Sequence, residues 1–239
     1  MKSVRAIRGI LFDKDGTLVD FYKTWFAIGT HMALLAADGD GERADELMAI
    51  AGYDSITGGF RADSAFAAGT NADIVALWYP HLSAAGRLER VSAFDQITAE
   101  EAAATAVPVD RCKETITELH RLGLRLGLAT NDSTSGAERT LLALGIAQMF
   151  DAAFGYDAVA NPKPAPDVIY AFADMTGLRP SEIAMVGDNR HDLDTGKAAG
   201  AGLVIGVLSG TGTRETLAGA DVLLDSIADL PAFLAGRTL

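Results

Sequence analysis

The strongest constraint on the fold is a regular alternation between short apolar runs and helical patterns. Runs with the length and β-branched content of buried strands lie at 8–12, 124–130, 182–188, 202–208 and 220–225. Helical patterns lie between these runs, at 111–122, 134–144, 166–176 and 193–199. Continuous apolar strands suit a parallel sheet covered on both faces. The alternation therefore predicts a doubly wound, Rossmann-like α/β fold.

One long segment breaks this alternation. Between about Phe21 and Thr105 the chain is alanine-rich and helical in pattern, and we find no good strand there. The segment at 106–110 contains Pro108 and reads as the linker back to the sheet. We predict an α/β core domain formed by 1–19 and 105–239, with a helical cap domain at 20–104 inserted after the first strand.

Composition limits the classes of partner. The chain has 239 residues and a net charge of −12, so its average field repels nucleic acid. Its single cysteine, Cys112, rules out an internal disulfide and agrees with a reducing compartment. No segment approaches 18 uninterrupted apolar residues. We expect a cytoplasmic protein, a monomer or homodimer, that does not act on membranes.

Polar side chains gather where the predicted strands end. They are Asp13, Asp15, Thr130, Asn131 and Asp188, and Lys163 lies in the loop between them. Ligands of an open parallel sheet bind at the carboxyl ends of its strands. Carboxylates suit Mg²⁺, and an ammonium, a hydroxyl and backbone N–H groups suit phosphate. The sequence therefore predicts a joint site for Mg²⁺ and a phosphate group.

The first strand supplies two acids that can divide the chemistry. Alternation along an extended chain sends Asp13 and Asp15 to one side and Lys14 to the other. Asp13 could attack phosphorus to form an aspartyl-phosphate, while Asp15 protonates the leaving oxygen and later deprotonates water. Gly16 lets the backbone turn close to the phosphate, and backbone N–H groups near Gly16 could bind phosphate oxygens.

Four segments, taken in order, resemble the motifs of the haloacid dehalogenase superfamily of hydrolases, and most of all its phosphoglycolate phosphatase-like branch. They are "FDKDGTLVD", "LATN", "NPKPAPD" and "GDNRHDLDTGKAAGA". The match spans the core from Ile10 to about Gly202, with the helical insertion where such enzymes carry an α-helical cap. Lys14 and Asn189 depart from the family pattern, which often has an apolar residue and a serine there.

The resemblance implies a role for each matching residue. Asp13 is then the nucleophile and Asp15 the general acid/base, with Thr130 and Lys163 as phosphate ligands and Asp188 as a metal ligand. The backbone carbonyl of Asp15 would also contact the metal. Asp192 would orient Lys163 or a water on the metal. The implied activity is a Mg²⁺-dependent phosphatase for a small phosphorylated metabolite, with phosphoglycolate as the leading candidate.

Several residues keep a second interpretation. Asp188 and Asp192 could be a helix N-cap and a solvated acid. His191 lies between site acids, but Mg²⁺ prefers oxygen, so we expect an exposed loop histidine. Arg61 could reach a second anionic group of the substrate from a cap loop or could belong to a solvated turn. The "GTGT" segment at 210–213 reads as a plain turn.

Other activities stay open at this point. The main alternative is a sugar phosphate phosphomutase, which returns the phosphoryl group to another hydroxyl. A carbon–halogen hydrolase needs neither the metal nor the second acid. A receiver-like signalling domain would stop after one phosphate per chain.

Overall fold

A six-stranded parallel sheet forms the centre of the fold. The computed structural model describes residues 7–236, so the outermost parts of the predicted core, 1–6 and 237–239, lie outside the described residues. The strands are β1 (Gly9–Phe12), β4 (Arg125–Ala129), β5 (Ala152–Phe154), β6 (Ile183–Gly187), β7 (Leu203–Val207) and β8 (Val222–Leu224). Their spatial order is β5-β4-β1-β6-β7-β8. This order confirms the predicted doubly wound α/β class, with the topological switch between β1 and β6.

The sequence located five of these strands and missed β5. That strand has only three residues, Ala152, Ala153 and Phe154, and two of them are alanine. It pairs in parallel with β4, with Ala153 opposite Leu128. A run this short and poor in β-branched residues gives no strand signal, and its pairing with β4 defines it instead.

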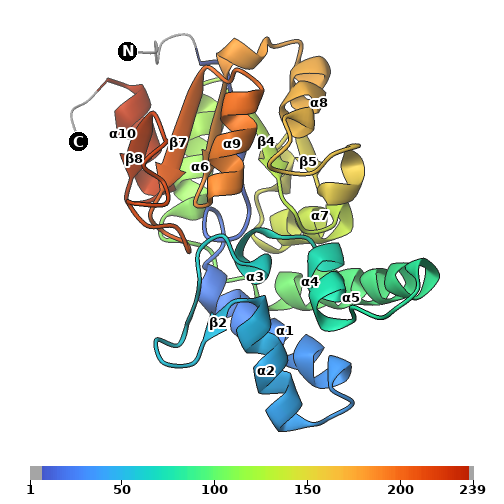
Figure 1. The fold of residues 1–239 in the computed structure, drawn as a ribbon. Helices are drawn as coiled ribbons and strands as arrows, with labels where there is room; N and C mark the ends of the chain where they lie inside the picture. The colour runs from blue at the N-terminus through green and yellow to red at the C-terminus, as the bar shows by residue number, and fades with distance from the viewer. Residues whose placement is uncertain (1–6, 237–239) are drawn as a thin grey trace.

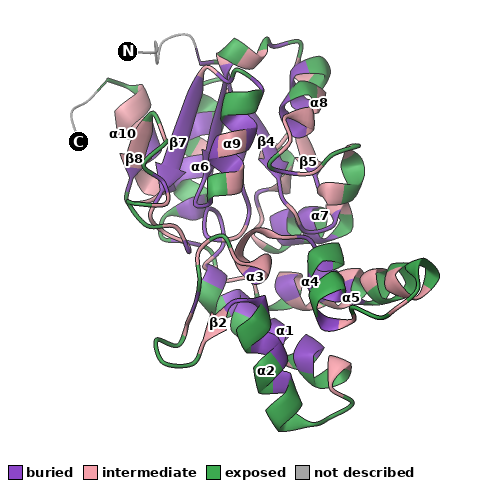
Figure 2. Ribbon diagram, viewed as in Figure 1, coloured by how far each residue is buried: buried purple, intermediate pink, exposed green. Residues whose placement is uncertain are grey.

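Helices cover both faces of the sheet. On one face lie α6 (Cys112–Arg121), α7 (Thr134–Ala143) and α10 (Leu230–Leu234), and on the other lie α8 (Asp167–Thr176) and α9 (Arg190–Ala198). Alternation along β1 sends Ile10 and Phe12 into the first hydrophobic cluster and Leu11 into the second. Figure 2 shows the central strands as buried between these layers. Both faces of the central strands are therefore shielded from solvent, which explains their continuous apolar sequences.

The segment after β1 forms a separate helical layer below the carboxyl edge of the sheet (Figure 1). Its helices are α1 (Phe21–Ala36), α2 (Gly41–Ala51), α3 (Ala65–Ala68), α4 (Asn71–Trp78) and α5 (Ala84–Thr105). They share a hydrophobic cluster of their own, rich in aromatic residues. The expectation of no strand here is wrong in one detail, because β2 (Tyr53–Asp54) and β3 (Gly59–Phe60) form a two-residue antiparallel pair. The domain boundaries at 20 and 104 stay a prediction.

The chain leaves and re-enters the core through two adjacent segments. The Asp20 N–H donates to the Val107 carbonyl at 2.8 Å, and the Val109 N–H donates to the Leu18 carbonyl at 3.0 Å. Both ends of the helical layer are thereby fixed next to the residues that follow β1. Within residues 7–236, no helix is long and apolar enough to cross a membrane.

Candidate active site

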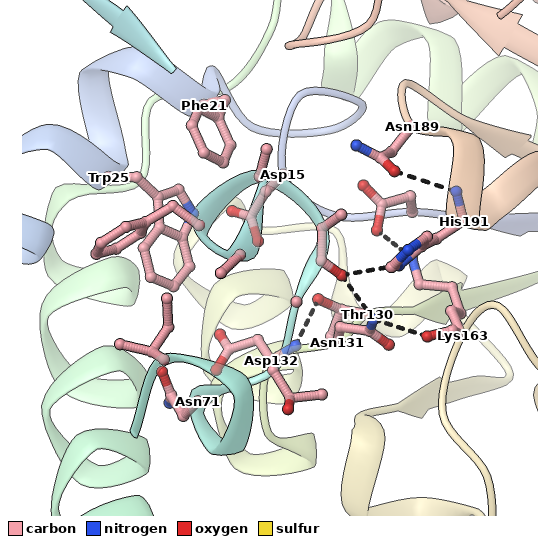
Figure 3. Close-up of a pocket in the computed structure, with 18 of the residues that line it drawn as sticks. Asp15, Phe21, Trp25, Asn71, Thr130, Asn131, Asp132, Lys163, Asn189 and His191 are labelled. Atoms are coloured by element: carbon pink, nitrogen blue, oxygen red, sulfur yellow. Dashed lines mark hydrogen bonds and ion pairs between the residues drawn. The ribbon is translucent and has the colours of Figure 1, made fainter. Parts of the chain in front are cut away.

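A pocket lies between the carboxyl edge of the sheet and the helical layer. Asp13 and Asp15 enter it after β1, Thr130 after β4, and Asn189 after β6. Figure 3 shows Asp15 between two groups of side chains, with Phe21 and Trp25 on one side and Lys163 and His191 on the other. The sequence thus brings residues that are far apart along the chain to one edge of the sheet, as the parallel topology requires.

Lys163 joins two carboxylates at the centre of the site. Its Nζ lies 2.6 Å from Asp13 Oδ1 and 2.7 Å from Asp192 Oδ1, and it donates to the Ala129 carbonyl at 2.9 Å. Burial alone would lower the pKa of Lys163, but the charges of Asp13 and Asp192 reverse this and raise it. Lys163 is therefore a fixed ammonium that is only 7% exposed.

Three buried carboxylates meet beside this ammonium. Oxygen atoms of Asp13, Asp188 and Asp192 all lie within 4.8 Å of one another. Burial raises the pKa of Asp13 to about 6, against the opposing charge of Lys163. Burial, together with the charges of Asp13 and Asp192, also raises the pKa of Asp188 well above its usual value. Carboxylates here outnumber the ammonium, and an all-oxygen set with excess negative charge fits a hard divalent cation.

The second interpretation of Asp192 as a solvated acid is wrong. Asp192 is 1% exposed, and its Oδ2 accepts from the Asn189 N–H at 3.0 Å while Oδ1 holds Lys163. The N-cap of α9 is Asn189, so Asp188 is free to point into the carboxylate cluster. Both acids therefore belong to the site rather than to a helix end on the surface.

The "GTGT" segment is more than a plain turn, because it contacts Asp188. The Thr211 N–H and hydroxyl donate to Asp188 Oδ2 at 2.7 and 3.2 Å. A Cβ on Gly210 would clash with the same oxygen. A glycine is thus required for this loop to reach the carboxylate. Sequence reasoning missed this contact, since the segment matches no phosphate-binding fingerprint.

Gly16 allows a close approach rather than offering a free amide. Its φ is +82°, and a Cβ there would come 2.5 Å from Asp188 Oδ2. The Gly16 N–H already donates to the Val19 carbonyl at 2.7 Å. The structure therefore gives no support to phosphate binding through this amide, and the backbone turn that Gly16 makes is the feature that the site uses.

Thr130 and Asn131 both line the pocket. The Thr130 hydroxyl accepts from the Asp132 N–H at 3.1 Å. The Asn131 amide donates to the Ala68 carbonyl of the helical layer at 2.8 Å and to the Lys163 carbonyl at 3.0 Å. Its Oδ1 is buried and has no hydrogen-bond partner among residues 7–236. Asn131 thus connects the sheet edge to the helical layer and keeps an acceptor for a ligand.

Lys14 does not point away from Asp15, as simple alternation along the strand predicts. It is completely buried, at 0% exposure, and its Nζ lies 2.6 Å from Asp132 Oδ2 and 3.2 Å from Asp15 Oδ2. The prediction that it points away from both acids is wrong for Asp15. The strand ends at Phe12, so the period of two no longer applies at position 14, and the turn brings Lys14 back to Asp15.

The helical layer forms an aromatic wall over the site. Phe21, Trp25 and Phe66 line the pocket together with Ile74 of α4.

His191 also lines the pocket, in the first turn of α9. Its Nδ1 lies 3.1 Å from the Ala68 carbonyl. The prediction of an exposed loop histidine is therefore wrong.

Arg61 does not belong to the lining of this pocket. Its guanidinium instead donates to the Ala49 carbonyl at 3.0 Å. The structure therefore does not bring this side chain together with the other predicted site residues.

Comparison with known proteins decides the family. A family model described as haloacid dehalogenase-like hydrolase matches residues 7–200. The chain belongs to the haloacid dehalogenase-like hydrolase family. Enzymes of this family generally use a divalent metal, in agreement with the buried carboxylate cluster.

Relatives narrow the activity of this haloacid dehalogenase-like hydrolase. It is 32% identical over 244 residues to the phosphoglycolate phosphatase of Salmonella typhimurium, covering 96% of this chain and 93% of that protein. It is 30% identical over 255 residues to the phosphoglycolate phosphatase of Escherichia coli K12, with the same coverage. These relatives identify the chain as a phosphatase, which acts on a small phosphorylated substrate.

Solved structures share the fold over nearly the whole chain. A predicted phosphoglycolate phosphatase from Haemophilus somnus superposes with a TM-score of 0.72 at 22% identity, covering 95% of this chain and 98% of that one. CbbY from Rhodobacter sphaeroides, solved in complex with phosphate, gives a TM-score of 0.65 at 26% identity, covering 94% of this chain and 96% of that one. The core and the helical insertion are therefore both present in these structures.

Proposed function

We propose that this phosphatase hydrolyses a small phosphorylated metabolite with Mg²⁺ as cofactor and through an aspartyl-phosphate on Asp13. The observation that carries the proposal is the Lys163 ammonium held between Asp13 and Asp192, with Asp188 in the same buried cluster. Phosphoglycolate is the leading candidate substrate, because the relatives with 30% identity or more reported above bear its name.

The residues present fit Mg²⁺ rather than a softer metal, because all available donors are oxygen atoms. Asp13, Asp188 and the backbone carbonyl of Asp15 would hold the cation, with Asp192 beside them. Bound there, Mg²⁺ would neutralise charge on the phosphoryl oxygens and on the carboxylates. Lys163 and Thr130 would bind the remaining phosphoryl oxygens.

In the first step a carboxylate oxygen of Asp13 attacks phosphorus. The bond between phosphorus and the ester oxygen breaks, and its electron pair stays on the leaving oxygen. Asp15, protonated at that moment, gives its proton to this oxygen and becomes a carboxylate. Burial raises the pKa of Asp15, although the charge of Lys14 opposes this, and a raised pKa favours the acid form that the step needs.

In the second step water attacks phosphorus of the aspartyl-phosphate. Asp15 takes a proton from the water, the bond between phosphorus and the Asp13 oxygen breaks, and inorganic phosphate leaves. Asp13 is regenerated as a carboxylate, and Asp15 is again protonated for the next cycle. Phe21, Trp25 and Phe66 of the aromatic wall line the pocket and would limit the access of bulk water to the leaving group during the first step.

The phosphomutase alternative gains no support. The relatives that share 30% identity or more and are named above are phosphatases by name, and none of those names describes an isomerase. Transfer to water is therefore the reaction to test first.

The test is phosphate release by the purified protein with Mg²⁺, on a panel of phosphate monoesters that includes phosphoglycolate. Asp13→Asn should abolish release, because a neutral amide cannot form the acyl phosphate. Asp174→Asn, at an exposed position on α8, is the matched control and should keep full activity. No release from any ester by the wild-type protein would overturn the proposal.

A further inference from the structure

We infer that Lys14 is a positioning residue that fixes the carboxyl of Asp15 for proton transfer to the leaving oxygen. The inference rests on the proposed function and assigns a role to a residue where the family pattern often has an apolar side chain. Lys14 is completely buried, although it is a lysine and lies in the sequence between Asp13 and Asp15.

Two carboxylates hold the Lys14 ammonium in place. Asp132 Oδ2 lies at 2.6 Å and Asp15 Oδ2 at 3.2 Å, and the ring centroid of Trp25 lies 5.5 Å from Nζ. Burying an ammonium is costly unless it is paired, so an arrangement without these partners is strongly disfavoured. The position of Nζ is therefore well defined, and an ammonium fixed in this way can orient Asp15.

The two oxygens of Asp15 have different surroundings. Oδ2 faces Lys14, while Oδ1 is buried and makes no hydrogen bond within residues 7–236, although the Trp25 indole N–H is near enough to Asp15 to oppose the rise in its pKa that burial causes. The side chain lines the pocket between the aromatic wall and Lys163 (Figure 3). Lys14 thus holds one oxygen and leaves the other for the substrate. An apolar residue at position 14 could pack against Asp15 but could not distinguish its two oxygens.

Asp132 carries this arrangement into the helical layer. Its Oδ1 accepts from the Ser133 N–H at 2.7 Å and from the Thr98 hydroxyl of α5 at 3.2 Å. Thr98 in turn accepts from the Asn71 amide of α4 at 3.2 Å. Asp132, which holds Lys14, is therefore itself held by residues of the core and of the helical layer. The orientation of Asp15 thus depends on contacts from both parts of the protein.

The consequence is a dependence on the leaving group. An alkoxide is strongly basic and needs a proton as it departs, whereas a nitrophenolate departs readily without one. If Lys14 acts through Asp15, removing it should damage hydrolysis of alkyl phosphates far more than hydrolysis of an aryl phosphate. A role in folding alone would lower both by the same factor.

The experiment compares Lys14→Met with the wild type on an alkyl phosphate and on p-nitrophenyl phosphate. The quantity is kcat/KM, because it covers the steps up to departure of the alcohol and leaves out hydrolysis of the phosphoenzyme. We expect kcat/KM for the alkyl ester to fall by roughly 100-fold, the lower range of general acid catalysis, with a much smaller fall for the aryl ester.

Two further variants separate positioning from folding. Lys14→Met with Asp132→Asn removes both charges, so that no carboxylate at position 132 is left buried without a cation, while Asp15 still lacks its partner. This double variant should keep the selective loss. In an Asp15→Asn background, Lys14→Met should cost little more on the alkyl ester, because the group through which it acts is already gone.

Equal losses on the two esters in both Lys14 variants would overturn the inference and leave the proposed phosphatase intact. Full additivity of Lys14→Met and Asp15→Asn would overturn it as well. Failure of the wild-type protein to hydrolyse either ester would instead overturn the proposed function. Each outcome therefore assigns the failure to one of the two proposals.

Discussion

Two buried lysines, Lys163 and Lys14, organise the pocket in the same way and with different consequences. Each ammonium lies between two aspartates, Asp13 and Asp192 for Lys163, and Asp15 and Asp132 for Lys14. The cluster at Lys163 has a further carboxylate, Asp188. The cluster at Lys14 instead has a neutral donor from α5.

This difference separates a reactive cluster from a positioning cluster. Three carboxylates gather at Lys163 and two at Lys14, so the excess of negative charge is larger at Lys163; a cation can bind there, and the pKa of Asp188 is raised by burial and by its neighbours. Around Lys14 the Thr98 hydroxyl of α5 completes the contacts of Asp132, and the cluster reaches the helical layer. If both proposals hold, one buried ion pair serves the chemistry and a second one in the same pocket serves orientation.

Of the two lysines, Lys163 in the reactive cluster should give the larger effect when its ammonium is removed. Lys163→Met leaves Asp13 and Asp192 without their shared cation and removes a phosphate ligand. We expect phosphate release to fall by about 10²- to 10³-fold on alkyl and aryl esters alike, because charge stabilisation is needed whatever the leaving group. Lys197→Met, at an exposed position on α9, is the control. If Lys163→Met lowered phosphate release only from alkyl esters, the proposed difference in role between Lys163 and Lys14 would be contradicted.

Metal binding should be strong only in the reactive cluster and should depend on pH. The pKa of Asp13 is raised from 3.8 to about 6, so its protonated form stabilises the metal-free fold below about pH 4, and this contribution is lost as the pH rises through 6. We therefore expect Mg²⁺ to raise the melting temperature more at about pH 8 than at about pH 5, where protons compete for the carboxylates.

Calorimetric or fluorescence melting curves with and without Mg²⁺ measure this difference. Asp188→Asn should remove most of the Mg²⁺-dependent shift, whereas Asp132→Asn should leave the shift in place, because Asp132 belongs to the cluster at Lys14. An equal rise in melting temperature at both pH values would contradict the assignment of the metal to the carboxylates whose pKa is raised.

The smallest effect should come from the link between the positioning cluster and α5. Thr98→Val removes the hydroxyl that donates to Asp132 and should lower the free energy of unfolding by about 1 kcal/mol, the usual scale of one hydrogen bond. It should also reproduce, in weaker form, the selective loss on alkyl esters. Thr105→Val, at the exposed last residue of the same helix, is the control. Identical behaviour of the two variants on both esters would show that α5 does not position Asp15.

Much of the fold was predictable because its signals are local. Apolar runs with strand length gave five of the six strands, and the alternation with helices gave the topology class. The missing strand, β5, consists of Ala152, Ala153 and Phe154, whose sequence carries no strand signal without its partner. The same limit applies to the short β2–β3 pair inside the helical segment.

The site was predictable in the part that the strand ends determine. Asp13 and Asp188 were placed together because parallel strands end at one edge of a sheet, Lys163 was added from the loop between the strands and Asp192 from the family resemblance, and the structure brings all four together. Their catalytic roles stay predictions until activity is measured.

The positioning cluster could not be read from the sequence. Lys14 and Asp132 are 118 positions apart, and their pairing depends on how the turn after β1 meets the loop after β4. The contact from Thr98 depends further on how α5 packs against α7. No periodicity or motif encodes such contacts, because they arise only from the packing of separate elements.

The most direct test of the account is the detection of the aspartyl-phosphate. The protein is mixed with an alkyl phosphate and Mg²⁺, quenched in acid within one turnover, digested and analysed by mass spectrometry. The account predicts a phosphoryl group on the peptide that contains Asp13, with more of it accumulating from the aryl ester than from the alkyl ester in Lys14→Met. A phosphoryl group on another residue, or turnover of substrate with none on the protein, would contradict the central claim.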